Sequence, residues 1–454
     1  MRERMSAVAV LVALAVLLHV GCRRASEEAT PPAGEPHLED AAAGFVHALV
    51  KEDYANAVRD FDDTMKKAMP AEKLEEAWRS LIAQAGAFQK QLGIHQQSVG
   101  PYEAVFVTCK FERATLDVKV VLDKAGRITG LWFVPPKVSY EYKPPAYVKK
   151  DFFQEEDVQV GAGKWMLPGT LTLPKGQGPF PAVVLVHGSG PHDRDETIGP
   201  NKPFRDLAWG LASRGIAVLR YEKRTKYHPK ELARMKEGIT VKEETIDDAL
   251  AAVKLLRQRD DITPAKIFVL GHSLGGMLVP RIGMRDKDIA GFILLAATTR
   301  PTEDVILEQM AYIFGLDGKL SEDEKKQLAK MREQVARVKD PKLSPETPSS
   351  DLPFGVPAAY WLDLRGYKPQ ETAQSLKHPM LILQGGRDYQ VTTTDFEGWK
   401  KSLSSRKNVT FKLYPELNHL FVAGKGKSTP AEYLTAGHVA EIVIKDIANW
   451  IKKQ

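Results

Sequence analysis

A serine flanked by glycines is the residue of this sequence that most clearly suggests chemistry. Ser273 is the centre of a Gly-His-Ser-Leu-Gly pentapeptide at positions 271–275. An apolar, strand-like run at 266–271 leads into it, and a helical pattern at 275–284 follows. In this strand–turn–helix context, a G-x-S-x-G motif exposes the serine hydroxyl at the head of the helix. Ser273 is therefore the predicted nucleophile of a covalent reaction.

A serine hydroxyl is a weak nucleophile, so it needs a general base that an acidic side chain orients. Asp388 follows a predicted strand at 380–383, and His419 follows the last predicted strand, at 409–414. Parallel strands end at one edge of a sheet, where ligands bind in open α/β sheets. Serine, aspartate, histidine is also the chain order that accompanies this motif. We predict a triad of Ser273, Asp388 and His419.

Each partner of the serine has an alternative in the sequence. Asp388 could be a solvated loop carboxylate, in which case Asp395 is the nearest substitute. His419 could be a packed loop histidine. His438 lies within the pattern of the final predicted helix, where its ring is expected to face neighbouring side chains. His187 is expected to be structural rather than a base.

The transition state of acyl transfer develops a negatively charged oxygen that preorganised donors must stabilise. One donor is expected to be the backbone N–H of Leu274, the residue after the nucleophile. The loop at 187–190 follows a predicted strand at 182–186, and its glycines let the backbone approach closely. The second donor is therefore expected to be the N–H of Ser189 or Gly190.

A longer stretch around this loop resembles a known family. Residues 187–196 read His-Gly-Ser-Gly-Pro-His-Asp-Arg-Asp-Glu, and residues 199–202 read Gly-Pro-Asn-Lys. This stretch resembles bacterial α/β-hydrolases of the esterase and dienelactone-hydrolase type, in a subgroup with an extra amino-terminal domain. The resemblance covers nearly all of residues 151–454. It implies hydrolysis of small-molecule carboxylic esters, usually with short acyl chains, through an acyl-enzyme and without a metal or organic cofactor.

The elements that must position these residues lie in the second part of the chain. Short aliphatic strands alternate with helical runs, and strands buried on both faces indicate a mostly parallel sheet. We expect a doubly wound α/β domain over 151–454, with an antiparallel edge hairpin around 167–173. No strand is expected between 298 and 377, where helical runs predict a cap over the site. A final helix is expected from 429 to about 450.

Residues 38–135 predict a small α+β domain. Three amphipathic helices, of which the second starts after Asp53 and reaches Phe61, precede an antiparallel sheet. This order is similar to the cone-shaped nuclear-transport-factor-2-like fold. The domain shows no acid, base or metal cluster, so a structural or dimerising role is expected, and with it a homo-oligomer. A stiff, proline-bracketed linker is expected at 136–150.

The amino terminus predicts export. A basic start and an apolar run at 7–18, too short to span a bilayer, fit a signal peptide at 1–21. Leu-His-Val-Gly before Cys22 resembles a bacterial lipoprotein cleavage site, although the histidine departs from the pattern. We expect Cys22 to be lipidated and to anchor the protein in the cell envelope through a tether at 22–37. The alternative is an ordinary signal peptide and a secreted or periplasmic protein.

Composition limits the other classes of function. The 454 residues carry 64 Lys+Arg and 58 Asp+Glu, a formal net charge of +6, with 43% hydrophobic and 27% charged residues. These values exclude a disordered chain and a multi-span membrane protein, and no dense basic run with aromatics suggests nucleic-acid binding. Two cysteines exclude a disulfide scaffold. Cys109 is expected to be a buried small hydrophobe.

Several side chains near the predicted site have two open roles. The charged residues could bind a polar substrate group, although ion pairs that order the loops are favoured; they are Asp193, Arg194, Asp195, Glu222, Lys223 and Arg224. A metal site formed by His192 with Asp193 and Asp195 lacks a further ligand cluster. The aromatic residues of the cap could line an acyl pocket or form the cap's own core; they are Tyr312, Phe314, Tyr360 and Trp361.

Two rival functions remain open, because one fold serves many reactions. A serine peptidase or aminopeptidase of the same fold must also bind an amino terminus or an extended chain, and no acidic pair in the predicted cap clearly does so. A non-catalytic binding protein of the envelope would use the first domain as its working part. Such proteins usually lose a member of the triad, and none is missing here.

Overall fold

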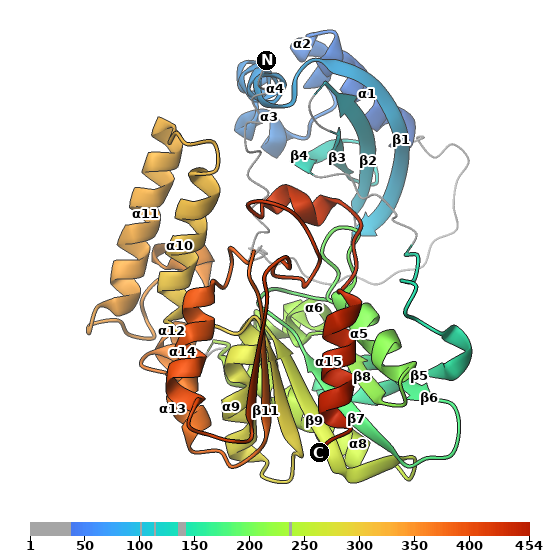
Figure 1. The fold of residues 1–454 in the computed structure, drawn as a ribbon. Helices are drawn as coiled ribbons and strands as arrows, with labels where there is room; N and C mark the ends of the chain where they lie inside the picture. The colour runs from blue at the N-terminus through green and yellow to red at the C-terminus, as the bar shows by residue number, and fades with distance from the viewer. Residues whose placement is uncertain (1–37, 100–101, 113–114, 135–141, 236–237) are drawn as a thin grey trace. The chain divides into compact units, whose positions relative to one another are not determined.

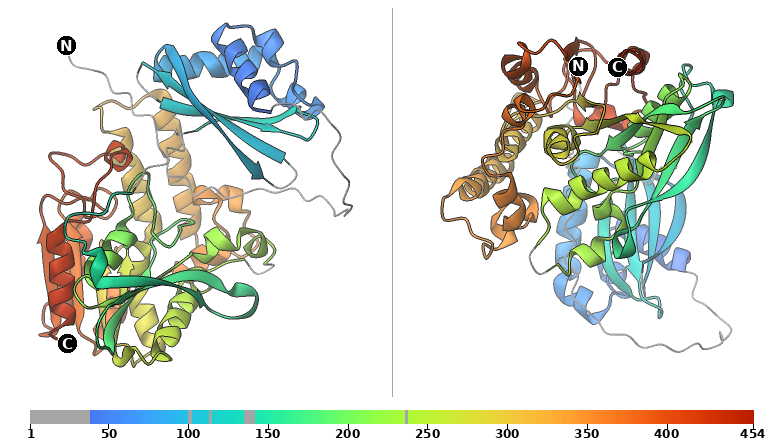
Figure 2. Two further views of the ribbon diagram at one scale, coloured as in Figure 1. Left: turned by 90° about the vertical axis from the view of Figure 1, so that its right-hand side faces the viewer. Right: turned by 90° about the horizontal axis from the view of Figure 1, so that it is seen from below.

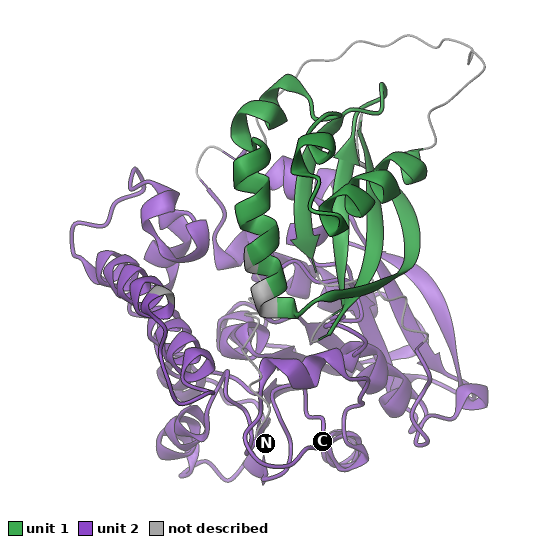
Figure 3. Cartoon of the chain, turned by 90° about the horizontal axis from the view of Figure 1, so that it is seen from above, with its two compact units in different colours: residues 1–8, 19–139 green, residues 9–18, 140–454 purple. Residues whose placement is uncertain are grey.

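The computed structural model describes residues 38–99, 102–112, 115–134, 142–235 and 238–454 (Figure 1). The chain divides into two compact units between residues 139 and 140 (Figure 3). Among the helices of the described residues, none is long and apolar enough to cross a membrane. The signal peptide, the tether and Cys22 lie outside the described residues, so these expectations stay predictions.

The first unit packs helices against one face of an antiparallel sheet with the order β1-β2-β3-β4. Its helices are α1 (Leu38–Val50), α2 (Tyr54–Ala57), α3 (Asp63–Ala68) and α4 (Ala71–Ala85), and its strands are β1 (Phe88–Val99), β2 (Tyr102–Phe111), β3 (Thr115–Leu122) and β4 (Ile128–Val134). Alternate residues of β2, including Val107 and Cys109, are buried together with Phe45 and Trp78 of the helices. The period-two pattern therefore marks the core face of the sheet, as expected.

The second helix of this unit differs from its prediction. Asp53 caps α2 by accepting a hydrogen bond from Asn56 N, but the helix ends at Ala57 instead of reaching Phe61. Phe61 pairs with Ile128 in an isolated β-bridge. An additional helix, α3, begins after Asp62, whose carboxylate accepts a 2.6 Å hydrogen bond from Met65 N. A second capping aspartate thus starts a short helix beyond the predicted one, which the sequence patterns did not indicate.

Eight strands form the sheet of the second unit, in the order β12-β11-β10-β9-β7-β8-β6-β5. Their bounds are β5 (Phe153–Val160), β6 (Leu167–Pro174), β7 (Phe180–Val186), β8 (Ala217–Tyr221), β9 (Ile262–His272), β10 (Gly291–Leu295), β11 (Met380–Gly385) and β12 (Val409–Tyr414). Neighbouring strands from β12 to β8 are parallel, while β6 pairs antiparallel with both β8 and β5. The predicted edge hairpin is therefore β5–β6.

Helices cover both faces of this sheet (Figure 1). On one face, α8 (Asp247–Arg257), α9 (Leu274–Arg285) and α14 (Thr393–Leu403) share a hydrophobic core with one set of strand residues. On the other face, α5 (Pro203–Ala212) and α15 (Glu441–Ile451) pack on the alternate set. The predicted doubly wound, mostly parallel architecture is confirmed.

The cap is inserted between β10 and β11. It contains α10 (Thr302–Phe314), α11 (Glu322–Lys339), α12 (Ala358–Leu364) and α13 (Pro369–Gln374), and α10 packs beside α11 (Figure 1, Figure 2). Helix α11 begins where Ser321 and Glu324 form a reciprocal capping box. Trp361 of α12 is buried in a hydrophobic cluster made of cap residues alone. The helical insertion expected between these two strands is confirmed.

Short helical turns join these elements: η1 (Lys150–Phe152), η2 (Gly163–Trp165), α6 (Arg224–Tyr227), α7 (Pro229–Leu232), the π-helical turn η3 (Lys242–Ile246), η4 (Ser349–Asp351), η5 (Pro353–Gly355) and η6 (Pro430–Leu434). The predicted single helix over 429–450 is wrong, because η6 and α15 are separate. His438 lies in the segment between them. The buried carboxylate of Asp206 holds this segment, since it accepts a 2.9 Å hydrogen bond from Val439 N and lies 3.1 Å from His438 Nδ1.

Candidate active site

The three predicted triad residues come from neighbouring strand ends. Ser273 follows β9 directly, Asp388 lies in the loop after β11, and His419 lies in the loop after β12. Strands β9 to β12 are consecutive and parallel in the sheet, so their carboxyl ends share one edge. The fold therefore brings all three residues to the same edge.

Ser273 stands on a strained turn between β9 and α9. Its backbone has φ 53° and ψ −117°, a conformation that residues other than glycine rarely adopt. Its N–H donates a 2.8 Å hydrogen bond to Leu295 O, which ties the turn to β10. A Cβ at Gly275 would lie 2.3 Å from Val186 O, so only glycine lets the helix pack this closely on the sheet. This is the local geometry of a nucleophile elbow.

The candidate acid and the candidate base form a buried pair. His419 Nδ1 lies 2.7 Å from Asp388 Oδ2, and both side chains are almost fully buried. The other carboxylate oxygen of Asp388 accepts hydrogen bonds from the N–H groups of Gln390 (2.8 Å) and Val391 (3.0 Å). A carboxylate that only accepts hydrogen bonds places the proton of the histidine on Nδ1. The Nε2 atom of His419 is then left with a lone pair for a proton.

His419 is also held through its backbone. His272, the residue before the nucleophile, places Nε2 3.0 Å from the carbonyl oxygen of His419, and the two rings lie 4.7 Å apart between centroids. Within the described residues, no hydrogen bond links Ser273 Oγ to His419. Such bonds are often long before a substrate is bound.

The alternative acids and bases have other partners. Asp395 is fully buried and accepts hydrogen bonds from Thr299 N (2.8 Å) and from the guanidinium of Arg300, at the start of the cap. His187 Nε2 lies 3.0 Å from Asp193 O, and burial lowers the pKa of this histidine to about 3. His438 pairs with Asp206 as described above.

The loop after β7 lies against the nucleophile. A Cβ at Gly188 would be 3.2 Å from Ser273 Cβ. The N–H of Gly188 is occupied, because it donates a 2.6 Å hydrogen bond to Glu196 Oε1. Among the described residues, Ser189 N, Gly190 N and Leu274 N have no hydrogen-bond acceptor. Leu274 opens α9, where backbone N–H groups lack partners within the helix.

The charged residues beside this loop order it. Asp193 accepts hydrogen bonds from Thr197 N (2.9 Å) and Thr197 Oγ1 (2.7 Å) within the loop. Arg194 binds Glu222 at 2.8 Å, and Asp195 forms an ion pair with the buried Arg220 of β8. No group of three or more His, Cys, Asp or Glu residues in the described ranges could hold a metal ion.

The four cap aromatics separate into two groups. Trp361 and Phe314 are buried, and the hydroxyl of Tyr360 donates a 2.7 Å hydrogen bond to Glu244 of η3. Tyr312 instead stacks on Tyr389 with ring centroids 5.1 Å apart. Since Tyr389 follows Asp388 directly, Tyr312 is the one of the four that reaches the loop of the candidate acid.

Sequence reasoning missed a second buried acid–histidine pair. Glu196 Oε2 lies 2.9 Å from His272 Nδ1. Burial alone would raise the pKa of Glu196, but the attraction of His272 outweighs it and lowers the pKa to about 2. Burial alone would lower the pKa of His272, and Glu196 instead raises it. Both residues lie in motifs quoted above, yet no local pattern pairs residues this far apart in the chain.

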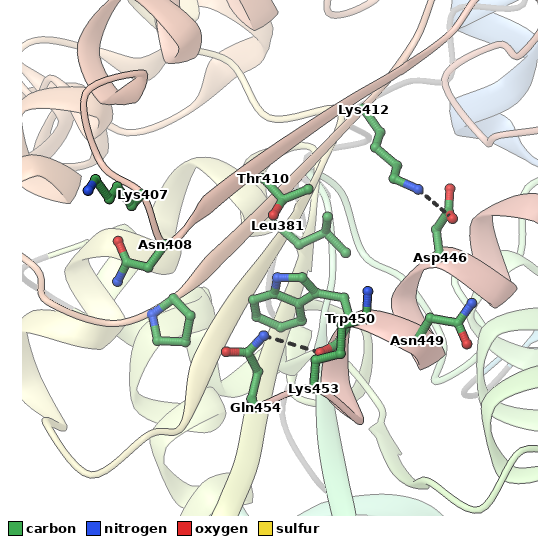
Figure 4. Close-up of a pocket in the computed structure, with 11 residues that line it drawn as sticks. Leu381, Lys407, Asn408, Thr410, Lys412, Asp446, Asn449, Trp450, Lys453 and Gln454 are labelled. Carbon is green, nitrogen blue, oxygen red and sulfur yellow. Dashed lines mark hydrogen bonds and ion pairs between the residues drawn. The ribbon is translucent and has the colours of Figure 1, made fainter.

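A pocket of about 410 Å³ lies away from these residues (Figure 4). Pro379, Asn408 and Thr410 in its lining lie at the amino ends of β11 and β12. Lys412 and Asp446, also in its lining, form an ion pair at 2.5 Å. Because the triad residues follow the carboxyl ends of the strands, this pocket belongs to the opposite edge of the sheet.

Comparison with known proteins adds two family matches and a close relative. Residues 177–424 match the family described as serine aminopeptidase, S33, and residues 42–131 match a family described as protein of unknown function, DUF3887. Esterase EstD of Thermotoga maritima is 42% identical over 412 residues, which make up 90% of this chain and 94% of that protein.

Solved structures that resemble this chain have lower sequence identity to it. Est1E from Butyrivibrio proteoclasticus is 17% identical with a TM-score of 0.42, and the match covers 65% of this chain and 98% of that one. The esterase domain of a Rhodothermus marinus protein is 16% identical with a TM-score of 0.40, covering 66% and 98%. These similarities are too weak to add to the sequence matches.

Proposed function

Since the chain belongs to the serine aminopeptidase S33 family of α/β-hydrolases, we propose that it hydrolyses carboxylic esters with Ser273 as nucleophile, His419 as general base and Asp388 as the orienting acid. The observation that carries this proposal is the buried 2.7 Å contact between His419 and Asp388, at the sheet edge where Ser273 stands on its strained turn. The relative named as an esterase supports an ester as the substrate.

The reaction proceeds in two halves. His419 Nε2 takes the proton of Ser273 as Oγ bonds to the ester carbon, and the electron pair of the carbonyl moves onto its oxygen. The intermediate collapses, the alcohol leaves with the proton from His419, and an acyl-enzyme remains. Water, deprotonated by His419, then releases the acid and restores Ser273. Asp388 stabilises the charged histidine in both halves.

The oxyanion needs donors that are in place before the reaction. In this proposal they are Leu274 N–H and the N–H of Ser189 or Gly190. Within the described part of the chain these N–H groups have no acceptor, and Gly188 lies close to Ser273; both observations support this assignment. Removing one such donor typically costs about 100- to 1,000-fold in kcat.

Short acyl chains are the proposed substrates. Tyr389 and Leu420, the residues next to Asp388 and His419, belong to a small hydrophobic cluster with Tyr433 and with Tyr312 of the cap. In this proposal the acyl chain lies against this cluster, and each methylene group buried there would contribute about 0.8 kcal/mol. Relative kcat/KM along p-nitrophenyl acetate, butyrate, octanoate and palmitate tests the limit; a maximum at palmitate contradicts it.

The family description makes peptide hydrolysis the second candidate. An aminopeptidase needs a carboxylate for the charged amino terminus of its substrate. Two carboxylates in the segments after β11 and β12 are already occupied, because Asp395 of α14 pairs with Arg300 and Glu432 of η6 pairs with Arg387. This observation favours esters over peptides.

Activity-based labelling tests the proposal. A fluorophosphonate is expected to modify Ser273, and the adduct is read by mass spectrometry of the peptide. Parallel assays use p-nitrophenyl butyrate and an aminoacyl p-nitroanilide. The absence of an adduct on the folded protein favours a non-catalytic binding protein, whereas faster turnover of the anilide favours a peptidase. Ester turnover by Ser273→Ala at the wild-type rate refutes the nucleophile.

We also propose that Cys22 is lipidated and anchors the protein in the cell envelope. The support is the apolar run before Leu-His-Val-Gly and Cys22. Mass spectrometry of the mature amino terminus decides: a diacylglyceryl-modified Cys22 is expected, and an unmodified one leaves a secreted or periplasmic protein.

The first unit is proposed to be structural, joining copies of the chain into a homo-oligomer. Its sequence offers no acid, base or metal cluster for chemistry. Light scattering of the mature chain is expected to give a mass above that of one copy, and a monomer would contradict this role.

A further inference from the structure

Both backbone groups of Gly188 are held by buried charged side chains. Its N–H donates to Glu196 Oε1 at 2.6 Å, and its carbonyl oxygen accepts a 2.6 Å hydrogen bond from Lys223 Nζ. The two side chains are 1% and 2% exposed. A hydrogen bond to a charged group is about twice as strong as one between neutral groups. Gly188, which lies beside Ser273, is therefore fixed from two sides.

The positive charge of Lys223 is compensated by a carboxylate that also binds a residue of the cap. Its Nζ lies 2.8 Å from Oε1 of the buried Glu244 in η3. The other oxygen of Glu244 accepts the 2.7 Å hydrogen bond from the hydroxyl of Tyr360 in α12. A continuous series of polar contacts thus runs from the cap, through Glu244 and Lys223, to Gly188.

These polar contacts bear on the reaction because they end at the peptide group between Gly188 and Ser189. The carbonyl of Gly188 and the N–H of Ser189 belong to the same planar trans peptide, so they point in opposite directions. A cation bound at the oxygen fixes the plane and therefore the direction of the Ser189 N–H. It also draws electron density from the nitrogen, which makes this N–H a more polar donor.

We propose that Lys223 is a positioning residue that orients and polarises the Gly188–Ser189 peptide, so that the Ser189 N–H stabilises the oxyanion, and that Glu244 and Tyr360 tie this lysine to the cap. The inference rests on the proposed function, and it assigns the second donor to Ser189 rather than Gly190. Arg224, the next residue, is also a buried cation, but its hydrogen bonds go to Asp248 of α8.

A matched pair of inhibitors measures the stabilisation of the oxyanion separately from other binding contacts. Ser273 adds to the carbonyl of 1,1,1-trifluoro-3-(hexylthio)propan-2-one and leaves the negative oxygen facing the donors, whereas 1-(hexylthio)propan-2-one has the same shape and forms little adduct. In Lys223→Met, kcat for p-nitrophenyl butyrate is expected to fall about 10- to 100-fold with KM unchanged. The affinity for the trifluoromethyl ketone should fall by the same factor, and that for the methyl ketone should not change.

Two further variants complete the test. Arg224→Met removes a neighbouring buried cation, and the ratio of the two inhibitor affinities should stay at the wild-type value. Tyr360→Phe removes one hydroxyl and should lower this ratio a few-fold; it carries the test alone if Lys223→Met does not fold. A wild-type ratio in the Lys223 and Tyr360 variants, or an equal fall in Arg224→Met, overturns the inference. Full turnover by Ser273→Ala would instead refute the proposed function.

Discussion

The ring of His272 joins the nucleophile's strand to the loop of the candidate base, because His272 Nε2 lies 3.0 Å from the carbonyl oxygen of His419. On its other side, His272 Nδ1 lies 2.9 Å from Glu196 Oε2. The residue before Ser273 therefore connects the loop after β7 with the loop after β12. One buried histidine thus holds these two loops to the end of β9, where Ser273 begins its turn.

Glu196→Gln is expected to destabilise the protein most at mildly acidic pH. The pKa of Glu196 is lowered to about 2, so its contribution is present above the ordinary value of 4.5 and is lost as the pH falls towards 2. The pKa of His272 is raised, so its contribution is present below 6.5 and is lost as the pH rises through the raised value. The pair is therefore worth most between about pH 4.5 and 6.5.

Urea unfolding at pH 5.5 and pH 8.5 measures this difference. Breaking a buried ion pair costs about 3–5 kcal/mol, and this loss should appear at pH 5.5 and shrink at pH 8.5. Glu441→Gln is the control, because Glu441 forms a more exposed pair with Arg214 and should cost less than about 1 kcal/mol at either pH. An equal loss for Glu196→Gln at both pH values would contradict the charged pair.

Asp388→Asn is expected to lower kcat about 10,000-fold without unfolding the protein. The amide of asparagine can donate to His419 Nδ1, which moves the ring proton to Nε2 and removes the lone pair that Ser273 needs. Steady-state kinetics with p-nitrophenyl butyrate give the rate. Asp395→Asn is the matched control: it should lower the midpoint of thermal unfolding and leave kcat of the folded enzyme near wild type. The reverse outcome would make Asp395 the acid.

Ser273→Gly is expected to be more stable than Ser273→Ala, although both should be inactive. The backbone of residue 273 has φ 53°, which glycine adopts without the steric cost that a Cβ brings. Strain of this kind costs about 1–3 kcal/mol, and the difference in the free energy of unfolding between the two variants should fall in that range. Equal stabilities would mean that the turn relaxes.

The thiol of Cys109 is expected to be inert in the folded protein. Burial between β2 and the helices of the first unit raises its pKa to about 12, so almost no thiolate exists at pH 8. Iodoacetamide at pH 8 should leave the Cys109 peptide unmodified, and the same treatment in 8 M urea (about the concentration that unfolds most domains) should alkylate it. Rapid alkylation of the native protein would show that this sheet opens.

Local patterns predicted the parts of the fold that local interactions form. The glycines around Ser273 predict the turn between β9 and α9. Aliphatic strands without alternation predicted the parallel sheet, and parallel strand ends placed Asp388 and His419 at one edge.

Contacts between distant residues could not be predicted in this way. Phe61 leaves its predicted helix for a bridge to Ile128, and His438 leaves the final helix for the buried Asp206. The contacts of Lys223 with Gly188 and of Glu196 with His272 join segments whose approach depends on the folded sheet. For Phe61 and His438, a tertiary contact outweighs the local preference for a helix.

The cap is inserted between two neighbouring strands and has a hydrophobic cluster of its own. This cluster includes Trp361, and the chain leaves and re-enters the sheet at β10 and β11, whose parallel register pairs Phe292 with Met380 without any cap residue between them. Exchange of the insertion would therefore leave the strand pairing unchanged, but a new cap would have to supply the ring of Tyr312, which stacks on Tyr389 beside Asp388. A graft that extends to α12 would have to keep Tyr360, because its hydroxyl is the contact through which a foreign cap would reach Glu244 and Lys223.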